Sequence, residues 1–140
     1  MPTIYASTNP DTLKAEAYYK GRRYGWTPAD FLTQLTIGMS WQLQRTLDLT
    51  DPDVRRTLGV KVTDILKCDW VAAQNAGNEA LTQAIARAAF ENLAEGMVVP
   101  SARHHGGVNI VYYPSNRLPG TVIEVLDPGG LPPDKHGLDP

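Results

Sequence analysis

Cysteine is nearly absent from this chain, since Cys68 is the single one among 140 residues. One thiol forms no internal disulfide and cannot build a zinc cluster, which points to a reducing compartment. A chain of this length, 42% of it hydrophobic, buries roughly two thirds of its unfolded surface and can fold without either kind of cross-link. We therefore expect one compact domain that resides in the cytoplasm.

Charge is not concentrated in one sign, and long hydrophobic runs are missing. Thirteen basic and fifteen acidic residues give a net charge of -2, without a cluster of lysines or arginines long enough to follow a phosphate backbone. This balance disfavours a DNA-binding regulator. No run of about eighteen apolar residues is present, nor a basic N-terminal segment followed by an apolar one. The composition favours a protein that is neither exported nor embedded in a membrane.

The common signatures of nucleotide-binding, protease and redox enzymes are missing too. The chain has no GxGxxG after a strand, P-loop, HExxH, GxSxG or CxxC. His104 and His105 invite a metal site, but neighbouring side chains of an extended segment point in opposite directions, and no carboxylate or thiol stands at ligand spacing. We expect no bound metal.

Caps and breakers mark the N-terminal elements. Residues 3–6 are prone to form a strand, and Asn9-Pro10 is a typical helix start, with asparagine as the N-cap and proline in the first turn. Gly21 predicts the end of this helix, which we expect over about residues 10–20.

The middle of the chain changes its period. From about residue 34 to residue 49, apolar residues alternate with polar residues or glycine, as in a half-buried strand. The pattern predicts a long strand or a hairpin bent near Gly38. Asp51-Pro52 then begins a short helix, which Gly59 ends.

The second half combines a long helix with short strands. A wide apolar stripe predicts the longest helix over residues 78–94, ended by Gly96. β-rich stretches follow at 97–99, 108–113 and 121–126. Because helices and strands mix without a regular βαβ repeat, the predicted fold class is α+β, a compact mixed sheet with flanking helices. Residues 128–140 are dense in proline and glycine and predict an extended or disordered tail.

Four segments, taken in order, resemble those of a known family. The first is IYASTNPDTLKAEA (4–17), similar to the family's "lYls.s.etAlaE", and the second is RTLDLTDPDVRRTL (45–58), similar to "vlDLtdp.v...LG". The third is Asp69-Trp70, which matches a DW pair. The fourth is LTQAIARAAFENLAEGMVVPSARHHGGVNIVYYP (81–114), similar to a TQ-containing helix, a "gl.vPSar" loop and a "g.nlv..P" strand. These segments resemble the RES-domain proteins, the toxins of a group of bacterial toxin–antitoxin pairs.

The resemblance implies a domain over residues 1–127 whose fold is similar to that of ADP-ribosyltransferases and whose substrate is NAD. Glu16 and Ser101 match the glutamate and the serine that contribute to the family's name. Tyr5 matches a tyrosine that lines the same pocket. The resemblance therefore implies that all three bind NAD and that Glu16 and Ser101 are catalytic.

The family's arginine lies N-terminal to the tyrosine segment, and no residue of this sequence matches it. The chain is then either an N-terminally shortened version or a divergent member. Arg22, Arg23 and Arg103 are candidates to take its place, because a planar, permanently charged guanidinium suits a phosphate or a ribose. Their spacing in the sequence favours none of them.

The matched residues suit cleavage of the nicotinamide–ribose bond. Glu16 would stabilise the oxocarbenium-like sugar, and Tyr5 would stack on the nicotinamide ring. Ser101 would present its hydroxyl and backbone N–H groups to a ribose or a phosphate. Apart from the resemblance, Glu16 is typical of a solvated residue paired with Lys20, Ser101 of a turn residue and Tyr5 of an edge aromatic.

The resemblance thus implies a toxin that consumes NAD, by degrading it or by transferring ADP-ribose, and so arrests growth. The implied partner is an antitoxin of the Xre/RES-associated type, whose C-terminal segment covers or enters the pocket. The alternative is a catalytically silent RES-like fold that serves as a protein-binding module. Hydrolysis, phosphorolysis and protein ADP-ribosylation break the same bond, and the sequence does not distinguish them.

Overall fold

The computed structural model describes residues 2–27, 29 and 36–126. A four-stranded sheet has the order β1 (Ile4–Ser7), β5 (Val108–Tyr112), β4 (Gly96–Pro100) and β3 (Thr46–Asp48). Strand β5 is antiparallel to both its neighbours, whereas β3 is parallel to β4. A separate two-stranded sheet pairs β2 (Met39–Gln42) with β6 (Val122–Val125).

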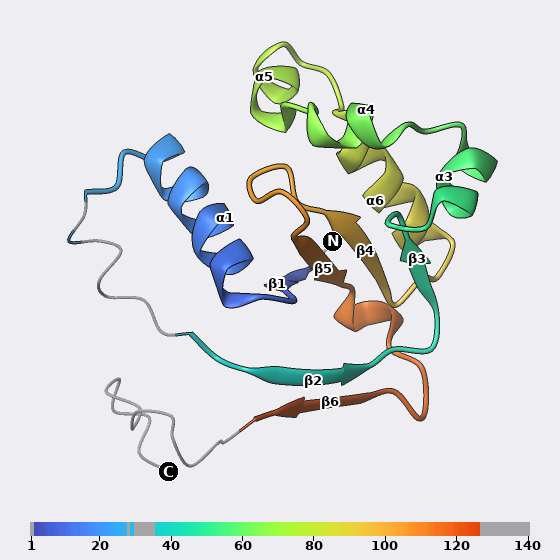
Figure 1. Ribbon diagram of the computed structural model, residues 1–140. Helices are drawn as coiled ribbons and strands as arrows, with labels where there is room; N and C mark the ends of the chain where they lie inside the picture. Colours follow the sequence, from blue (N-terminus) through green and yellow to red (C-terminus); the bar gives the residue numbers. More distant parts are fainter. Residues whose placement is uncertain (1, 28, 30–35, 127–140) are drawn as a thin grey trace.

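Helices flank the four-stranded sheet. Helix α1 (Pro10–Arg23) contacts β1 and β5, whereas α4 (Val62–Leu66) and α6 (Leu81–Glu91) contact β4. Figure 1 shows α3 (Pro52–Leu58) and α5 (Trp70–Asn75) on the same side of the molecule as α4 and α6. The predicted α+β class, a mixed sheet with flanking helices, is confirmed. The tail predicted for residues 128–140 lies outside the described residues.

Helix α1 begins as predicted but ends later. The Asn9 side chain accepts a hydrogen bond from the backbone N–H two residues on (2.7 Å), and Pro10 follows in the first turn. The predicted end at Gly21 is wrong, because Gly21 is buried within the helix and the left-handed glycine that follows is Gly25 (φ 75°). The helix therefore reaches Arg23, and its last turn carries two arginines.

The alternating segment forms neither one strand nor a hairpin bent near Gly38. Strands β2 and β3 belong to different sheets, and the chain leaves one for the other at residues 43–45. There the buried Glu95 carboxylate accepts hydrogen bonds from the backbone N–H groups of Gln44 (2.6 Å) and Arg45 (3.2 Å). Because these two donors point at a side chain, they are not available to a strand ladder. The first residues of the predicted strand, up to residue 35, lie outside the described residues.

Helix α6 is shorter than the helix predicted for residues 78–94, and α1 is longer than α6. Ala80 has extended backbone angles, and its N–H donates to the side chain of Gln83 (3.2 Å), which fixes the start of the helix one residue later. A short 3-10 turn (Pro114–Asn116) follows β5. The sequence did not predict this turn, α4 or α5, because such short elements carry too few residues to show a period.

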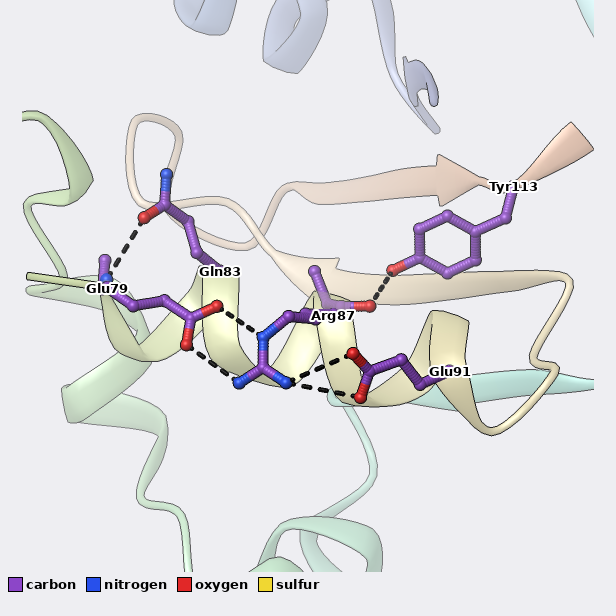
Figure 2. A network of polar contacts seen from close by, with 7 residues as sticks. Glu79, Gln83, Arg87, Glu91 and Tyr113 are labelled. Atoms are coloured by element: carbon purple, nitrogen blue, oxygen red, sulfur yellow. Dashed lines mark hydrogen bonds and ion pairs between the residues drawn. The ribbon is translucent and has the colours of Figure 1, made fainter. Parts of the chain in front are cut away.

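Figure 2 shows how the two faces of α6 differ. On the exposed face, Arg87 donates to Glu79 (2.8 and 3.0 Å) and pairs with Glu91 (3.3 Å). On the buried face, the Tyr113 hydroxyl donates to the carbonyl oxygen of Ala86 (3.1 Å). Exposed ion pairs contribute little each, so the helix is held mainly through its buried face.

The hydrophobic core lies between α6, α4 and the four-stranded sheet. Its buried side chains are Leu49, Ile65, Ala89, Ala94, Met97, Val111 and Tyr113. The Phe90 ring packs edge-on against Tyr113, with ring centres 5.6 Å apart. Burial and, to a smaller degree, the nearby Tyr5 raise the pKa of the Tyr113 phenol to about 12. The core thus reaches β5, the strand that also contacts α1.

Candidate functional site

Three elements meet at Glu16, which lies half-buried in the second turn of α1. Its Oε1 atom accepts one hydrogen bond from the Ser101 hydroxyl (2.5 Å) and a second from Asn109 Nδ2 (2.7 Å). Ser101 directly follows β4, and Asn109 belongs to β5. The structure therefore brings together Glu16 and Ser101, the two predicted catalytic residues, which are 85 positions apart in the sequence.

The Ser101 hydroxyl is fully engaged by the protein. It is buried, and it accepts hydrogen bonds from the backbone N–H groups of Arg103 and His104, both at 3.2 Å. A serine hydroxyl has two lone pairs and one proton, so its single proton is left for Glu16. Ser101 consequently ties the carboxylate of α1 to the loop after β4.

The second carboxylate oxygen of Glu16 is open. Both described donors bind Oε1, and none of the described residues donates a hydrogen bond to Oε2. No buried side-chain polar atom of the described residues lacks a partner, so Oε2 is in contact with solvent. A carboxylate that is oriented through one oxygen and accessible through the other can face a developing positive charge.

Asn109 is in turn oriented from β1. Its side-chain carbonyl Oδ1 accepts a hydrogen bond from the Ser7 hydroxyl (2.7 Å), and the two residues are register partners in the β1–β5 pair. This bond leaves the amide group free to donate to Glu16. Sequence reasoning missed both Asn109 and Ser7. A polar residue within the apolar segment VNIVYY was the available signal.

The loop that carries Ser101 is closed on itself and packed on α1. Ser101 N donates to the Gly107 carbonyl (2.9 Å), and Gly107 N donates to the His104 carbonyl (2.9 Å). His104 Nδ1 and the hydroxyl of the buried Thr12 share a hydrogen bond of 2.7 Å. A Cβ atom on Gly107 would approach Thr12 Cγ2 to 2.7 Å, so only glycine fits here. The loop geometry therefore depends on contact with α1.

Tyr5 is exposed on β1, with 70% of its surface accessible. Side chains alternate along a strand, so Tyr5 lies on the same face of β1 as Ser7. Its register partner on β5 is Val111, whereas that of Ser7 is Asn109. Tyr5 makes no hydrogen bond with Glu16 or Ser101 among the described contacts, and its ring is accessible to a ligand.

The three candidate arginines, which their spacing in the sequence did not rank, line one pocket. An open pocket of about 570 Å³ is lined by Ala15, Tyr18, Tyr19, Arg22, Arg23 and Arg103. The Arg103 guanidinium lies over the Tyr19 ring, 3.4 Å from its centre. Arg23 donates to the Tyr19 hydroxyl (3.0 Å) and forms an ion pair with Asp69 (3.1 Å). The later end of α1 is thus what brings Arg22 and Arg23 to this pocket.

Two further features bear on the class of site. Within residues 2–27, 29 and 36–126, no three His, Cys, Asp or Glu side chains gather in a way that could hold a metal ion. No helix in these ranges is both long enough and apolar enough to cross a membrane.

Comparisons with known proteins agree with this architecture. The model of the RES domain family matches residues 1–131, so the chain belongs to the RES domain family. Among solved structures, the chain is similar to one in the "crystal structure of the M.tuberculosis MbcT-MbcA toxin-antitoxin complex", with a TM-score of 0.55 and 24% identity. The match covers 91% of this chain and 68% of that one, and it shows the shared fold. No curated protein matches the chain.

Proposed function

We propose that this chain is the toxin of a toxin–antitoxin pair and that it cleaves the nicotinamide–ribose bond of NAD. The observation that carries this proposal is the Glu16 carboxylate, which is held through Oε1 and open at Oε2. Membership of the RES domain family supports the proposed class. So does the fold shared with a chain of a solved toxin–antitoxin complex.

Cleavage of this bond requires a group that stabilises a sugar cation. The C–N bond breaks, its electron pair moves to the nitrogen of the nicotinamide ring, and the positive charge passes to the ribose as an oxocarbenium ion. Oε2 of Glu16 faces this cation with a negative charge whose position is already fixed by Ser101 and Asn109. An acceptor then attacks the sugar with its own electron pair and releases a proton to Glu16 or to solvent.

Ser101 serves in this proposal as a positioning residue. Its proton is committed to Glu16 and its lone pairs to two backbone N–H groups, so the hydroxyl has no capacity left for a ribose or a phosphate. This role differs from the direct contact with substrate that the family resemblance implied. Asn109 has the same role, as the second donor to Oε1.

Tyr5 is the residue that we assign to the nicotinamide ring. Its aromatic side chain is exposed, and it is two residues from Ser7, which orients Asn109 and through it Glu16. An exposed aromatic face suits stacking on a flat heteroaromatic ring. The proposed partner is an antitoxin whose segment covers this face, in line with the complex in which the structural relative was solved.

The test is nicotinamide release from NAD by the purified full chain, followed by chromatography with and without inorganic phosphate. The wild type and Glu124→Gln should release nicotinamide, whereas Glu16→Gln should not. Glu124 is a matched control, because it is an exposed carboxylate on β6. A rate that rises with phosphate identifies phosphate as the acceptor, and a rate independent of phosphate leaves water or a protein side chain as the acceptor.

Two results would contradict the proposal. The first is equal release by the wild type and Glu16→Gln, which would assign the chemistry to another residue. The second is no release by folded wild type at saturating NAD, which would favour the silent, protein-binding alternative. Growth arrest on expression separates the same two readings, because only the enzyme should arrest cells and be relieved by Glu16→Gln.

A further inference from the structure

We infer that the pocket between the end of α1 and the loop after β4, lined by Arg22, Arg23 and Arg103, is a site for the diphosphate of a nucleotide. The identity of the nucleotide as NAD rests on the proposed function. The affinity for a diphosphate rests on the residues of the pocket alone, and these are outside the Glu16–Ser101–Asn109 cluster.

Charge is the first observation behind this inference. Three guanidinium groups line the pocket, its described lining includes no carboxylate, and Asp69 pairs with one of the three, Arg23. Among the described residues, Arg103 has no hydrogen bond or ion pair from its guanidinium, and Arg22 donates to the Tyr18 hydroxyl (3.2 Å) without a carboxylate partner. An excess of positive charge therefore remains, and the phosphates of a diphosphate carry the complementary charge.

Rigidity is the second observation. The guanidinium of Arg103 is stacked on the Tyr19 ring, and Arg23 is bonded to the hydroxyl of the same tyrosine. Arg22 lies 5.6 Å from the centre of the Tyr18 ring. A long side chain that is already immobilised loses less entropy when it binds, so these stacked arginines are prepared for a ligand. Arg103 still has its N–H donors available after stacking.

Continuity with Glu16 is the third observation. Glu16, Tyr19 and Arg23 follow one another on α1 at spacings of three and four residues, so they lie on one face of the helix. Seven residues correspond to roughly 10 Å along a helix axis. Arg103 is linked to the same cluster, because its backbone N–H donates to the Ser101 hydroxyl. A diphosphate in the pocket thus holds the attached ribose on the Glu16 side of α1.

The experiment is calorimetric titration of the full chain with ADP, which carries a diphosphate but no nicotinamide–ribose bond. We expect ADP to bind, adenosine to bind at least about tenfold more weakly, and the affinity for ADP to fall as salt rises. Arg103→Ala and Arg22→Ala should each weaken ADP binding by about tenfold or more. Arg56→Ala is the matched control, since Arg56 lies on α3 and pairs with Asp53 at the surface.

A conservative variant separates charge from shape. Arg103→Lys keeps the charge but loses the planar fork and the stacking on Tyr19, so it should bind ADP less tightly than wild type and more tightly than Arg103→Ala. Circular dichroism establishes that each variant is folded. Equal affinity for ADP in wild type, Arg22→Ala and Arg103→Ala would overturn the inference. So would equal affinity for adenosine and ADP, or binding of an acidic peptide at these arginines with no binding of ADP.

The two proposals fail independently. If ADP binding depends on the arginines while NAD is not cleaved, the diphosphate site stands and the proposed function fails. If NAD is cleaved while ADP binding ignores the arginines, the function stands and the site fails.

Discussion

The residues that flank β4 lead to two glutamates with opposite environments. Glu95 directly precedes the strand, and Ser101, which holds Glu16, directly follows it. The Glu95 carboxylate is fully buried and receives hydrogen bonds on both oxygens, from the backbone N–H groups of Gln44, Arg45 and Leu118 and from the Thr121 hydroxyl. Glu16 receives two hydrogen bonds, and both go to Oε1.

The difference shows what turns a carboxylate into a structural anchor or a chemical group. Burial alone raises the pKa of Glu95, but its four hydrogen bonds outweigh burial, and the pKa lies below its ordinary value. A carboxylate satisfied on both oxygens has no position left for a ligand. Glu16 is oriented by a hydroxyl and a side-chain amide, and its accessible second oxygen is what makes it a candidate catalytic group.

The largest effect is expected from Glu95→Ala. Four donors, three of them backbone groups that cannot turn away, lose their partner at a buried place. At about 1 kcal/mol or more for each, the free energy of unfolding should fall by about 4 kcal/mol or more. Urea denaturation followed by circular dichroism measures this loss. Glu124→Ala is the control, and a loss in Glu95→Ala no greater than in the control would refute the anchor role.

Glu16→Gln should reduce the rate of nicotinamide release strongly and change the stability little. The rate of nicotinamide release should fall about 100- to 1,000-fold, because a neutral amide does not stabilise the sugar cation. The free energy of unfolding should change by less than about 1 kcal/mol, since the site is half open to solvent. Rate and urea stability are measured on the same preparation. A destabilisation as large as that of Glu95→Ala would remove the distinction between the two glutamates.

Gly107→Ala tests whether the loop depends on α1. The added Cβ would meet the side chain of the buried Thr12, so we expect a loss of about 1–3 kcal/mol in stability together with slower nicotinamide release. Gly38→Ala is the control, because its Cβ would meet Leu126 at an ordinary contact distance of 3.6 Å. Equal stability and rate in the two variants would mean that the loop tolerates displacement from α1.

Asn109→Ala tests how much the second hydrogen-bond donor contributes to orienting Glu16. Loss of the Nδ2 donor leaves the carboxylate held by Ser101 alone, and we expect kcat to fall about tenfold with KM nearly unchanged. Ser7→Ala should act in the same direction with a smaller effect, because Ser7 reaches Glu16 only through Asn109. Steady-state kinetics at several NAD concentrations separate kcat from KM. A change confined to KM would place Asn109 in substrate binding.

The smallest effect concerns acid stability. The pKa of Glu95 is lower in the folded protein than in the unfolded chain, so its ionisation stabilises the fold at neutral pH. This stabilisation is complete above the unfolded value of about 4.3 and is lost as pH falls through the lower, folded value. Urea midpoints at pH 7 and pH 3 should therefore differ more for wild type than for Glu95→Gln. Identical pH dependence in both proteins would show that other groups control acid unfolding.

Local signals predicted the helix starts well. Asn9 and Asp51 both cap helices as expected, and Gly59 ends α3 in a left-handed conformation (φ 69°). These signals act within a single turn of the chain, so the sequence around them is sufficient. The break between β2 and β3 depends instead on Glu95, fifty residues away along the chain.

In the candidate site, too, the sequence identified some residues, and contacts between distant parts of the chain determine the others. Glu16 and Ser101 were found through motifs of a family to which the chain belongs. Asn109 and Ser7 were not found, because their pairing depends on the register of β1 against β5. The grouping of the three arginines depends on a helix that continues past Gly21 and on a loop from the far half of the chain.

The hydrogen bonds of the site join the two ends of the sequence: Glu16 to Ser101, Thr12 to His104, and Ser7 to Asn109, which are 85, 92 and 102 positions apart. During synthesis, the N-terminal helix leaves the ribosome long before its partners exist. At about 5–20 residues per second, translation through Asn109 takes on the order of 5–20 s. Throughout that interval nothing orients the Glu16 carboxylate, so the site is assembled only after residue 109 has been made.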